Sequence, residues 1–268
     1  MSDDTDAEKR DTAARFSRAA TDYRDSDTHR RGEDLETLAA WCAGADRALD
    51  VATGAGHTAG ALNRAGVASV VAVDAAPAMV EAAVDAYGVE ACVADAERLP
   101  FAAAAFDAVT CRIAAHHFPA PESFVEEAAR VLTPGGTLAF EDNVAPANPR
   151  EARFVDGVER LRDPSHVGLD TPAEWRRRFV GAGFTVEEET TVTRRLDFQA
   201  WCDRTAVSER DRRELRRRFA EADAALHERF AVVSGPGGIE SFVVPKRLFR
   251  LRKRGSTTGT DPGRADER

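Results

Sequence analysis

The sequence contains few cysteines, few lysines and no long apolar run, and each shortage argues against a class of protein. Its 4 cysteines include no Cys-x-x-Cys pair, so neither a disulfide framework nor a zinc cage is indicated. No apolar run approaches the roughly 20 residues that cross a bilayer. The acidic start, Met-Ser-Asp-Asp-Thr-Asp, is unlike a signal peptide. We therefore expect a cytoplasmic protein with no membrane partner.

Basic residues are fewer than acidic ones, with 37 Lys and Arg against 46 Asp and Glu. The formal net charge is therefore −9 over 268 residues. This excess of acid argues against nucleic acid as a partner. An Arg-rich stretch over residues 210–218 could suggest RNA binding, but Leu215 and Phe219 begin an apolar stripe at helical spacing. The arginines then fall on the opposite face of a helix, so a solvated surface is the better interpretation.

A glycine-rich turn at residues 53–56 is the most informative feature that is present. An apolar strand, Ala48–Ala52, runs into Gly54 and Gly56, and a helix-forming segment follows. Glycine lets the backbone turn sharply and approach a ligand closely, because it has no Cβ. The following helix would present free N–H groups at its start. This arrangement predicts a nucleotide site.

Acidic residues end the next two apolar runs. Asp74 follows the run 69–73, and Asp95 with Ala96 follows the strand Glu90–Ala94. A carboxylate at the end of the second strand can accept bonds from both hydroxyls of a ribose, in NAD enzymes and S-adenosylmethionine (SAM) enzymes alike. The chain further contains Asp50 near the end of the first strand and a Leu-Thr-Pro-Gly-Gly turn at 132–136.

Strands and helices alternate between residues 48 and 141, which predicts a doubly wound α/β fold with a mostly parallel, seven-stranded sheet. The capping box that begins at Thr171 predicts a further helix that ends near Gly181 or Gly183. The last strand would be entered through Pro245. The expected strands are Ala48–Ala52, Val70–Asp74, Glu90–Ala94, Ala105–Cys111, Thr137–Glu141, Phe184–Thr193 and Leu248–Arg252.

These motifs together resemble the class I SAM-dependent methyltransferases, and in particular the small-molecule group that includes quinone-biosynthesis C-methyltransferases. The resemblance implies a Rossmann-like fold, SAM as cofactor and a small-molecule methyl acceptor. A third glycine is common where this chain has His57. The residues that the resemblance assigns to SAM are Tyr23, Asp50, Thr53, Gly54, Gly56, Asp74, Ala75, Asp95, Ala96, Arg112 and Ile113.

The same resemblance divides the chain into parts. It implies a methyltransferase domain over residues 11–254, with an N-terminal lid at about 11–44, a cofactor core at 45–145 and a substrate or lid region at about 146–237. Residues 1–10 and 255–268 are polar, and we expect both to be disordered tails. The oligomeric state is left open between a monomer and a homodimer.

Two histidines are candidate catalytic bases. His117, after the fourth strand, would lie beside the transferred methyl group. Because imidazole titrates near neutral pH, His117 could accept a proton from the incoming nucleophile. Adjacent extended residues point in opposite directions, so His116 and His117 should not both line one pocket. His166, in the polar cluster 162–166, could instead contact the substrate, or Asp163 and Ser165 there could simply end a helix. No tight ligand spacing predicts a metal site.

Two other functions remain open from the residues. An NAD(P)-dependent reductase would share the glycine turn and Asp74, but neither Tyr23 nor Tyr87 has the lysine four positions on that such enzymes use. A non-catalytic SAM-binding protein would keep the cofactor residues without an acceptor pocket. Among acceptors, a quinone-like ring carbon, a hydroxyl and an amine are not separated.

Overall fold

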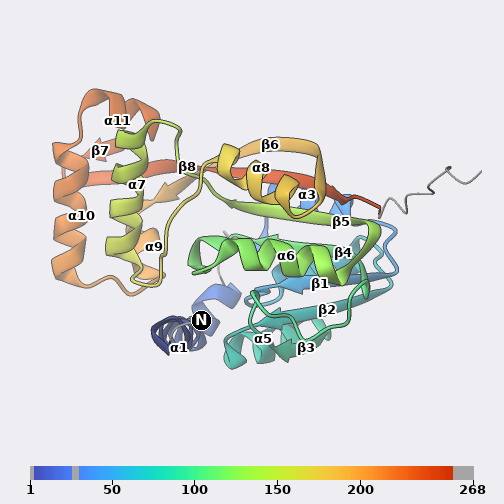
Figure 1. Cartoon of the computed structure of the whole chain (residues 1–268). Helices are drawn as coiled ribbons and strands as arrows, with labels where there is room; N and C mark the ends of the chain where they lie inside the picture. Colours follow the sequence, from blue (N-terminus) through green and yellow to red (C-terminus); the bar gives the residue numbers. More distant parts are fainter. Residues whose placement is uncertain (1–2, 26–29, 256–268) are drawn as a thin grey trace, which may run out of the picture.

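The computed structural model describes residues 3–25 and 30–255 of the chain. Seven strands form a continuous sheet in the order β3-β2-β1-β4-β5-β8-β6, and a short strand β7 pairs with β8 (Figure 1). The bounds are β1 Arg47–Val51, β2 Ser69–Asp74, β3 Glu90–Val93, β4 Phe106–Arg112, β5 Leu132–Asn143, β6 Phe184–Asp197, β7 Val233–Gly235 and β8 Gly238–Lys253.

The predicted doubly wound, mostly parallel sheet is confirmed. Strands β1 to β5 pair in parallel, because each is an apolar run connected to the next by a crossover, and β8 pairs antiparallel with β5 and β6. In β1 and β2 nearly every residue is buried, as expected of strands covered on both faces.

Two hydrophobic cores lie on the two faces of the sheet. One contains side chains of α3 (Glu33–Trp41), α4 (His57–Arg64) and α5 (Pro77–Tyr87). The other contains side chains of α6 (Pro121–Val131) and α8 (Pro172–Gly181), and α8 begins with the predicted capping box. The sheet is therefore held rigidly, and its loops can carry a site.

A helical lobe surrounds the far ends of β6 and β8. It consists of α7 (Pro149–Arg162), α9 (Phe198–Asp203), α10 (Glu209–Glu221), α11 (Ala224–Arg229) and β7, around a third core (Figure 1). The prediction that Pro245 begins the last strand is wrong, since β8 begins at Gly238. The Pro245 carbonyl accepts from Val144 N, just past the end of β5, so its missing N–H breaks no ladder bond.

Helix α1 (Asp3–Asp25) packs against α5 beside the sheet. The expected disordered tail over residues 1–10 is therefore wrong for residues 3–10. Lys9 accounts for this difference, because its ammonium group pairs with Asp95 and Glu97 in the loop after β3. The expected tail over 255–268 lies outside the described residues, apart from residue 255.

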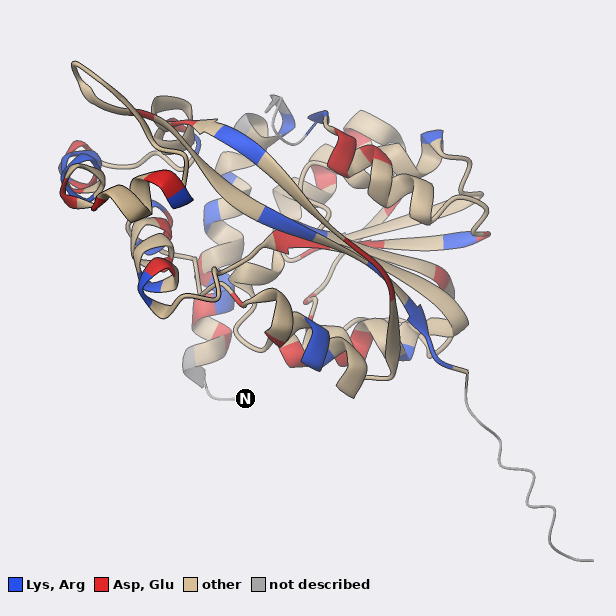
Figure 2. Cartoon of the chain, turned by 90° about the horizontal axis from the view of Figure 1, so that it is seen from above, with Lys and Arg blue, Asp and Glu red and all other residues tan. Residues whose placement is uncertain are grey.

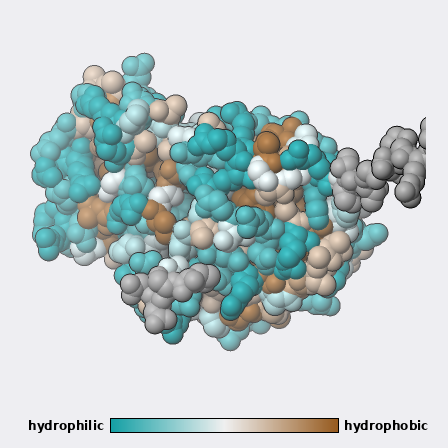
Figure 3. All heavy atoms as spheres, in the orientation of Figure 1, coloured by the Kyte–Doolittle hydropathy of each residue, from teal (hydrophilic) through white to brown (hydrophobic). Residues whose placement is uncertain are grey.

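The surface is mixed in charge. Figure 2 shows Arg and Lys interspersed with Asp and Glu over the helices, and Arg217 and Arg218 both pair with Glu214 on α10. In Figure 3 hydrophilic residues cover most of the visible face, with hydrophobic residues in small patches. Over the residues described, no helix is both long and apolar enough to cross a membrane.

Candidate active site

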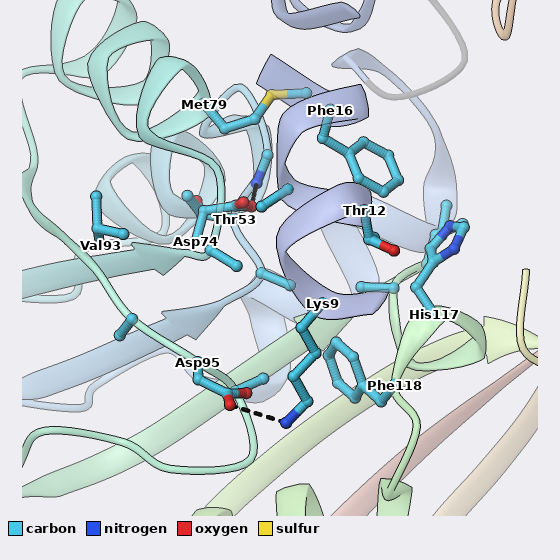
Figure 4. A pocket seen from close by; sticks show the side chains of 18 of the residues that line it. Lys9, Thr12, Phe16, Thr53, Asp74, Met79, Val93, Asp95, His117 and Phe118 are labelled. Carbon is cyan, nitrogen blue, oxygen red and sulfur yellow. Dashed lines mark hydrogen bonds and ion pairs between the residues drawn. The ribbon is translucent and has the colours of Figure 1, made fainter. Parts of the chain in front are cut away.

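A cavity of about 420 Å³ lies at the carboxyl ends of β1, β2, β3 and β4, with α1 as one of its walls (Figure 4). The carboxyl end of a parallel sheet is where ligands bind in this class of fold. Most of the predicted SAM residues line this cavity, namely Tyr23, Thr53, Gly54, Asp74, Ala75, Asp95, Ala96, Arg112 and Ile113.

The glycine turn faces this cavity with bare backbone. Gly54 has φ +54°, and a Cβ built on it meets no atom within 4 Å, so a side chain there would enter the open space that Gly54 lines. Gly56 has φ +86°, and its Cβ would come within 2.8 Å of Ala83 on α5. Gly56 therefore packs α4 against α5, while Gly54 keeps the cavity open.

Asp50 differs from its predicted place, because it lies beneath the turn and does not line the cavity. Its side chain, on a residue only 1 % exposed, accepts hydrogen bonds from Thr53 Oγ1 at 2.6 Å, Thr110 Oγ1 at 2.7 Å and Ala59 N at 3.1 Å. Burial raises the pKa of this carboxyl group to about 6, against those bonds. Asp50 thus ties β1, the turn, α4 and β4 together.

Asp74 sits at the end of β2 with its carboxylate fixed by the backbone. Its Oδ2 accepts from Gly54 N at 2.9 Å, and its Oδ1 accepts from Ala76 N at 2.9 Å. A carboxylate has about four lone-pair positions, so both oxygens can still accept from a ligand. Burial raises the pKa of Asp74 above its ordinary value.

Asp95 carries a contact that sequence reasoning missed. Lys9 Nζ on α1 lies 2.8 Å from Asp95 Oδ2 and also pairs with Glu97 (Figure 4). Burial lowers the pKa of Lys9, but the bonds to the two carboxylates outweigh it and raise that pKa overall. No local pattern of residues indicates these two ion pairs, since the partners of Lys9 stand 86 and 88 positions away from it.

Arg112 ends β4, and Ile113 follows it beside the cavity. The guanidinium of Arg112 is buried and donates to Glu141 Oε2 at 2.9 Å and to Asp34 Oδ2 at 2.6 Å. Burial opposes ionisation of Asp34, but Arg112 and Lys246 hold the pKa of Asp34 well below its ordinary range. Ile113 adopts φ +54°, where a β-branched residue is strained, and its N–H donates to Glu141 O.

His117 lines the cavity at the far end from Asp95 (Figure 4). Its Nδ1 lies 3.1 Å from the carbonyl oxygen of Ser165, which can only accept. Nδ1 must therefore carry the proton, and Nε2 keeps a lone pair. Burial lowers the pKa of His117 to about 3, so the ring is neutral at physiological pH.

His116 does not turn away from His117 as predicted, because Ala115–His117 forms a 3₁₀ turn and not an extended segment. The two ring centroids are 4.1 Å apart. His116 Nδ1 lies 2.6 Å from Asp142 Oδ1, and burial raises the pKa of Asp142 to about 7. Burial also lowers the pKa of His116 to about 3, so the imidazole of this buried pair is neutral at physiological pH.

His166 does not line the cavity, which contradicts its expected contact with a substrate. The chain turns back after α7, so His166 is buried with its Nε2 2.9 Å from Asp156 Oδ1 of that helix. Its ring lies behind His116, at a centroid distance of 5.7 Å.

A second cavity of about 70 Å³ adjoins the first, and Phe16, Tyr23, Ile113 and His117 line both. Burial raises the pKa of Tyr23 above its ordinary value. Most of its other wall residues escaped prediction because they come from β6, β8 and α9, far apart in the chain. They include Arg194, Leu196, Trp201, Arg204, Val244 and Lys246.

The chain is similar to known methyltransferases over most of its length. The model of the methyltransferase domain family matches residues 49–140. An uncharacterized Bacillus subtilis methyltransferase, YcgJ, is 33 % identical over 232 residues, covering 83 % of this chain and 91 % of that protein. Its crystal structure matches with a TM-score of 0.76, covering 83 % of this chain and 99 % of that one.

Two further relatives bear on the kind of chemistry. A candidate methyltransferase of Bacillus halodurans is 38 % identical, with a TM-score of 0.80 over 83 % of this chain and all (100 %) of that one. A demethylmenaquinone methyltransferase of Deinococcus radiodurans is 39 % identical over 108 residues, which is 38 % of this chain and 45 % of that protein.

Proposed function

Because the chain belongs to the class I SAM-dependent methyltransferases, we propose that it methylates a small molecule held beside His117. The observation that carries this proposal is that the two cavities share Phe16, Tyr23, Ile113 and His117 in their walls. The larger cavity has a volume that suits the cofactor, and the smaller one adjoins it at His117, beside which we expect the methyl group. SAM is the cofactor of the family.

The residues of the larger cavity fit that cofactor. Gly54 leaves open space against the backbone, and Asp74 retains acceptor capacity for the two hydroxyls of a ribose. We propose that Asp95 and Ala96 bind the adenine edge, and that Thr53, Ala75, Arg112, Ile113 and Tyr23 complete the remaining wall. Gly56 and Asp50 act indirectly, by shaping the turn.

SAM supplies an electrophilic methyl group on a sulfonium centre. The protein then has to orient the acceptor, exclude water from the site and remove a proton from the acceptor. We propose that His117 is the proton acceptor, through the unprotonated Nε2 that its bond to Ser165 O implies. Phe16 packs edge-on against the His117 ring at 5.0 Å and helps to exclude water. His116 and Asp142 position the turn from behind.

Methylation of a quinone-like ring carbon is the second candidate. It is favoured by relatives that are demethylmenaquinone methyltransferases, although those matches cover about half of their length or less. The smaller cavity argues for a compact, polar acceptor instead, because cationic side chains from α7, β6 and β8 enter its wall. The volume of this cavity, about 70 Å³, also favours a small acceptor over one with a long apolar tail.

Calorimetric titration with S-adenosylhomocysteine (SAH) and, separately, NADH tests the cofactor assignment. We expect saturable SAH binding and no NADH binding. Asp74→Ala should weaken SAH binding, while Asp85→Ala, an exposed acidic residue on α5, should leave it unchanged. Binding of NADH without SAH would overturn the proposal, as would SAH binding that ignores the Asp74 substitution.

A further inference from the structure

A short polar segment that follows α7 contacts the ring of His117. Asp163, the residue at which the helix ends, is 6 % exposed, and Ser165 is 9 % exposed. Neither of them is part of the wall of the larger or the smaller cavity. Any effect of these two side chains on a molecule in the cavities therefore has to pass through His117.

The segment is fixed by hydrogen bonds of its own. Pro164 holds Asp163 in an extended conformation, and α7 ends there. Asp163 Oδ1 accepts from Ser165 N at 2.9 Å, which closes a turn through a side chain. Val167 N donates to the carbonyl oxygen of His116 at 2.9 Å, so the segment is also tied to the neighbouring 3₁₀ turn. The expected helix stop is thus confirmed, but it does not account for the hydroxyl group of Ser165.

That hydroxyl group bridges Asp163 and His117. Its Oγ lies 2.5 Å from Asp163 Oδ1 and 3.2 Å from His117 Nδ1. Burial opposes ionisation of Asp163, but His117 and Ser165 lower its pKa overall, and an ionised carboxylate can only accept. The hydroxyl proton therefore lies toward Asp163, and the same oxygen can only accept from His117.

His117 Nδ1 thus faces two acceptors that belong to one residue. The carbonyl oxygen of Ser165 lies 3.1 Å away and the hydroxyl oxygen 3.2 Å away. Both favour the ring form that carries its proton on Nδ1 and a lone pair on Nε2. Burial lowers the pKa of His117, and the negative charge of Asp163 acts in the opposite direction. A proton that arrives at Nε2 is therefore stabilised by Asp163.

We propose that Ser165 and Asp163 are positioning residues for His117, in addition to ending α7. Ser165 holds the proton on Nδ1, which leaves Nε2 free to accept the proton that the methyl acceptor loses. Asp163 orients the Ser165 hydroxyl group and offsets the positive charge that the ring then gains. The Nδ1 proton and the hydroxyl proton stay in place throughout. This inference rests on the proposed function, because it assigns partners to the base named there.

The first test observes the ring nitrogens of His117 by NMR, in the full-length protein labelled with ¹⁵N-histidine at neutral pH. The signals of His117 are those that His117→Gln removes. We expect the wild type to carry the proton on Nδ1. In Ser165→Ala that proton should exchange with water about tenfold faster, which corresponds to the loss of roughly one hydrogen bond. Ser165→Thr keeps a hydroxyl group and should restore slow exchange at least in part.

The second test measures how fast diethylpyrocarbonate acylates His117, followed by tandem mass spectrometry. The reaction needs a lone pair on a ring nitrogen and passes through a positively charged ring. Ser165→Ala should slow it about tenfold, again the loss of roughly one hydrogen bond. Asp163→Asn should slow it as well, because the amide oxygen can still accept from Ser165 but the negative charge is gone. A residue that merely ends a helix predicts no change in Asp163→Asn.

Ser208 and Asp211 provide a matched control at the start of α10. The Ser208 hydroxyl group donates to Asp211 Oδ2 at 2.7 Å, and Asp211 N donates to Ser208 Oγ at 3.1 Å. Neither residue is part of the wall of either cavity. Ser208→Ala and Asp211→Asn should leave the NMR signals and the acylation rate of His117 unchanged. If Ser165→Ala does not fold, Asp163→Asn decides alone, because it keeps the hydrogen bonds of the turn.

A wild-type ring with its proton on Nε2 overturns the inference, and so does a wild-type acylation rate in Asp163→Asn. SAH titration of the same proteins separates the two proposals. If SAH binds while His117 responds to neither Ser165 nor Asp163, the inference is wrong and the methyltransferase function stands. If the wild type does not bind SAH, the proposed function fails, whereas the NMR signals still report on how Ser165 holds His117.

Discussion

Replacing Gly54 by alanine should damage cofactor binding much more than folding, and Gly44 provides the matched control. Both glycines have positive φ, +54° and +83°, and a Cβ built on either meets no atom within 4 Å. They differ in position, since Gly54 lines the large cavity and Gly44 lies in the exposed turn between α3 and β1. The two substitutions therefore impose a similar backbone cost at two different places.

That backbone cost is about 1–2 kcal/mol for an L-residue in the left-handed region. In a chain of this size it should lower the melting temperature by about 2–4 °C per kcal/mol in either variant. The methyl group of Gly54→Ala additionally enters the space that we assign to the cofactor. Loss of about one hydrogen bond there weakens SAH binding about tenfold, or about 1.4 kcal/mol.

Thermal unfolding without ligand and calorimetric SAH titration of both variants make the comparison. We expect similar melting temperatures, with SAH binding weakened only in Gly54→Ala. Wild-type affinity in Gly54→Ala would refute the reasoning, because the open space beside Gly54 would then not be the cofactor site. Equal loss of affinity in both variants would show that backbone strain, and not the cavity, controls binding.

Three other outcomes are expected. Gly60→Ala should lower the free energy of unfolding by about 1–3 kcal/mol in urea titrations, because its Cβ would lie 2.2 Å from the ring of Tyr87; unchanged stability would contradict that packing. Asp34→Ala should destabilise the protein by about 3 kcal/mol, since it leaves Arg112 with one carboxylate fewer. Because the folded-state pKa of Asp34 is lowered, the wild type should lose this stabilisation as the pH falls below about 4, and the variant should not. His117→Ala should lower kcat about 10²-fold or more with SAH affinity kept. The folded-state pKa of His117 is depressed to about 3, so His117 stays unprotonated down to that pH, and an acidic limb of kcat near pH 6.5 that vanishes in the variant would contradict the assignment.

The central fold could be predicted because its signals are local. Each parallel strand contains a short apolar run, and the runs of β1, β2 and β3 lead to Gly54, Asp74 and Asp95 at one edge of the sheet. The long strand β8 was underestimated because Pro245 reads as a strand start. The residues near Pro245 do not indicate that the neighbouring strand β5 ends at Asn143. Because β5 ends there, the missing N–H of Pro245 breaks no hydrogen bond of the ladder.

The side-chain orientations and long-range contacts of the site could not be predicted in the same way. The orientation of His116 depends on a 3₁₀ turn in which the His116 N–H donates to Asp142 Oδ2 on β5. Lys9 reaches Asp95 across 86 positions, and Arg204 lies close enough to Arg162 for their charges to interact, although the two stand far apart in the chain. Such contacts follow from tertiary packing, which leaves no periodic trace in the sequence.

The way in which the two cavities are assembled suggests how the enzyme could diversify. The family model covers residues 49–140, which contain the glycine turn, Asp74 and Asp95, whereas most of the smaller cavity is built from segments outside that range. Changes in α7, β6, α9 or β8 could therefore alter the accepted substrate while the cofactor half is inherited intact. Relatives that share only the first half of this chain would then be expected to use the same methyl donor on different molecules.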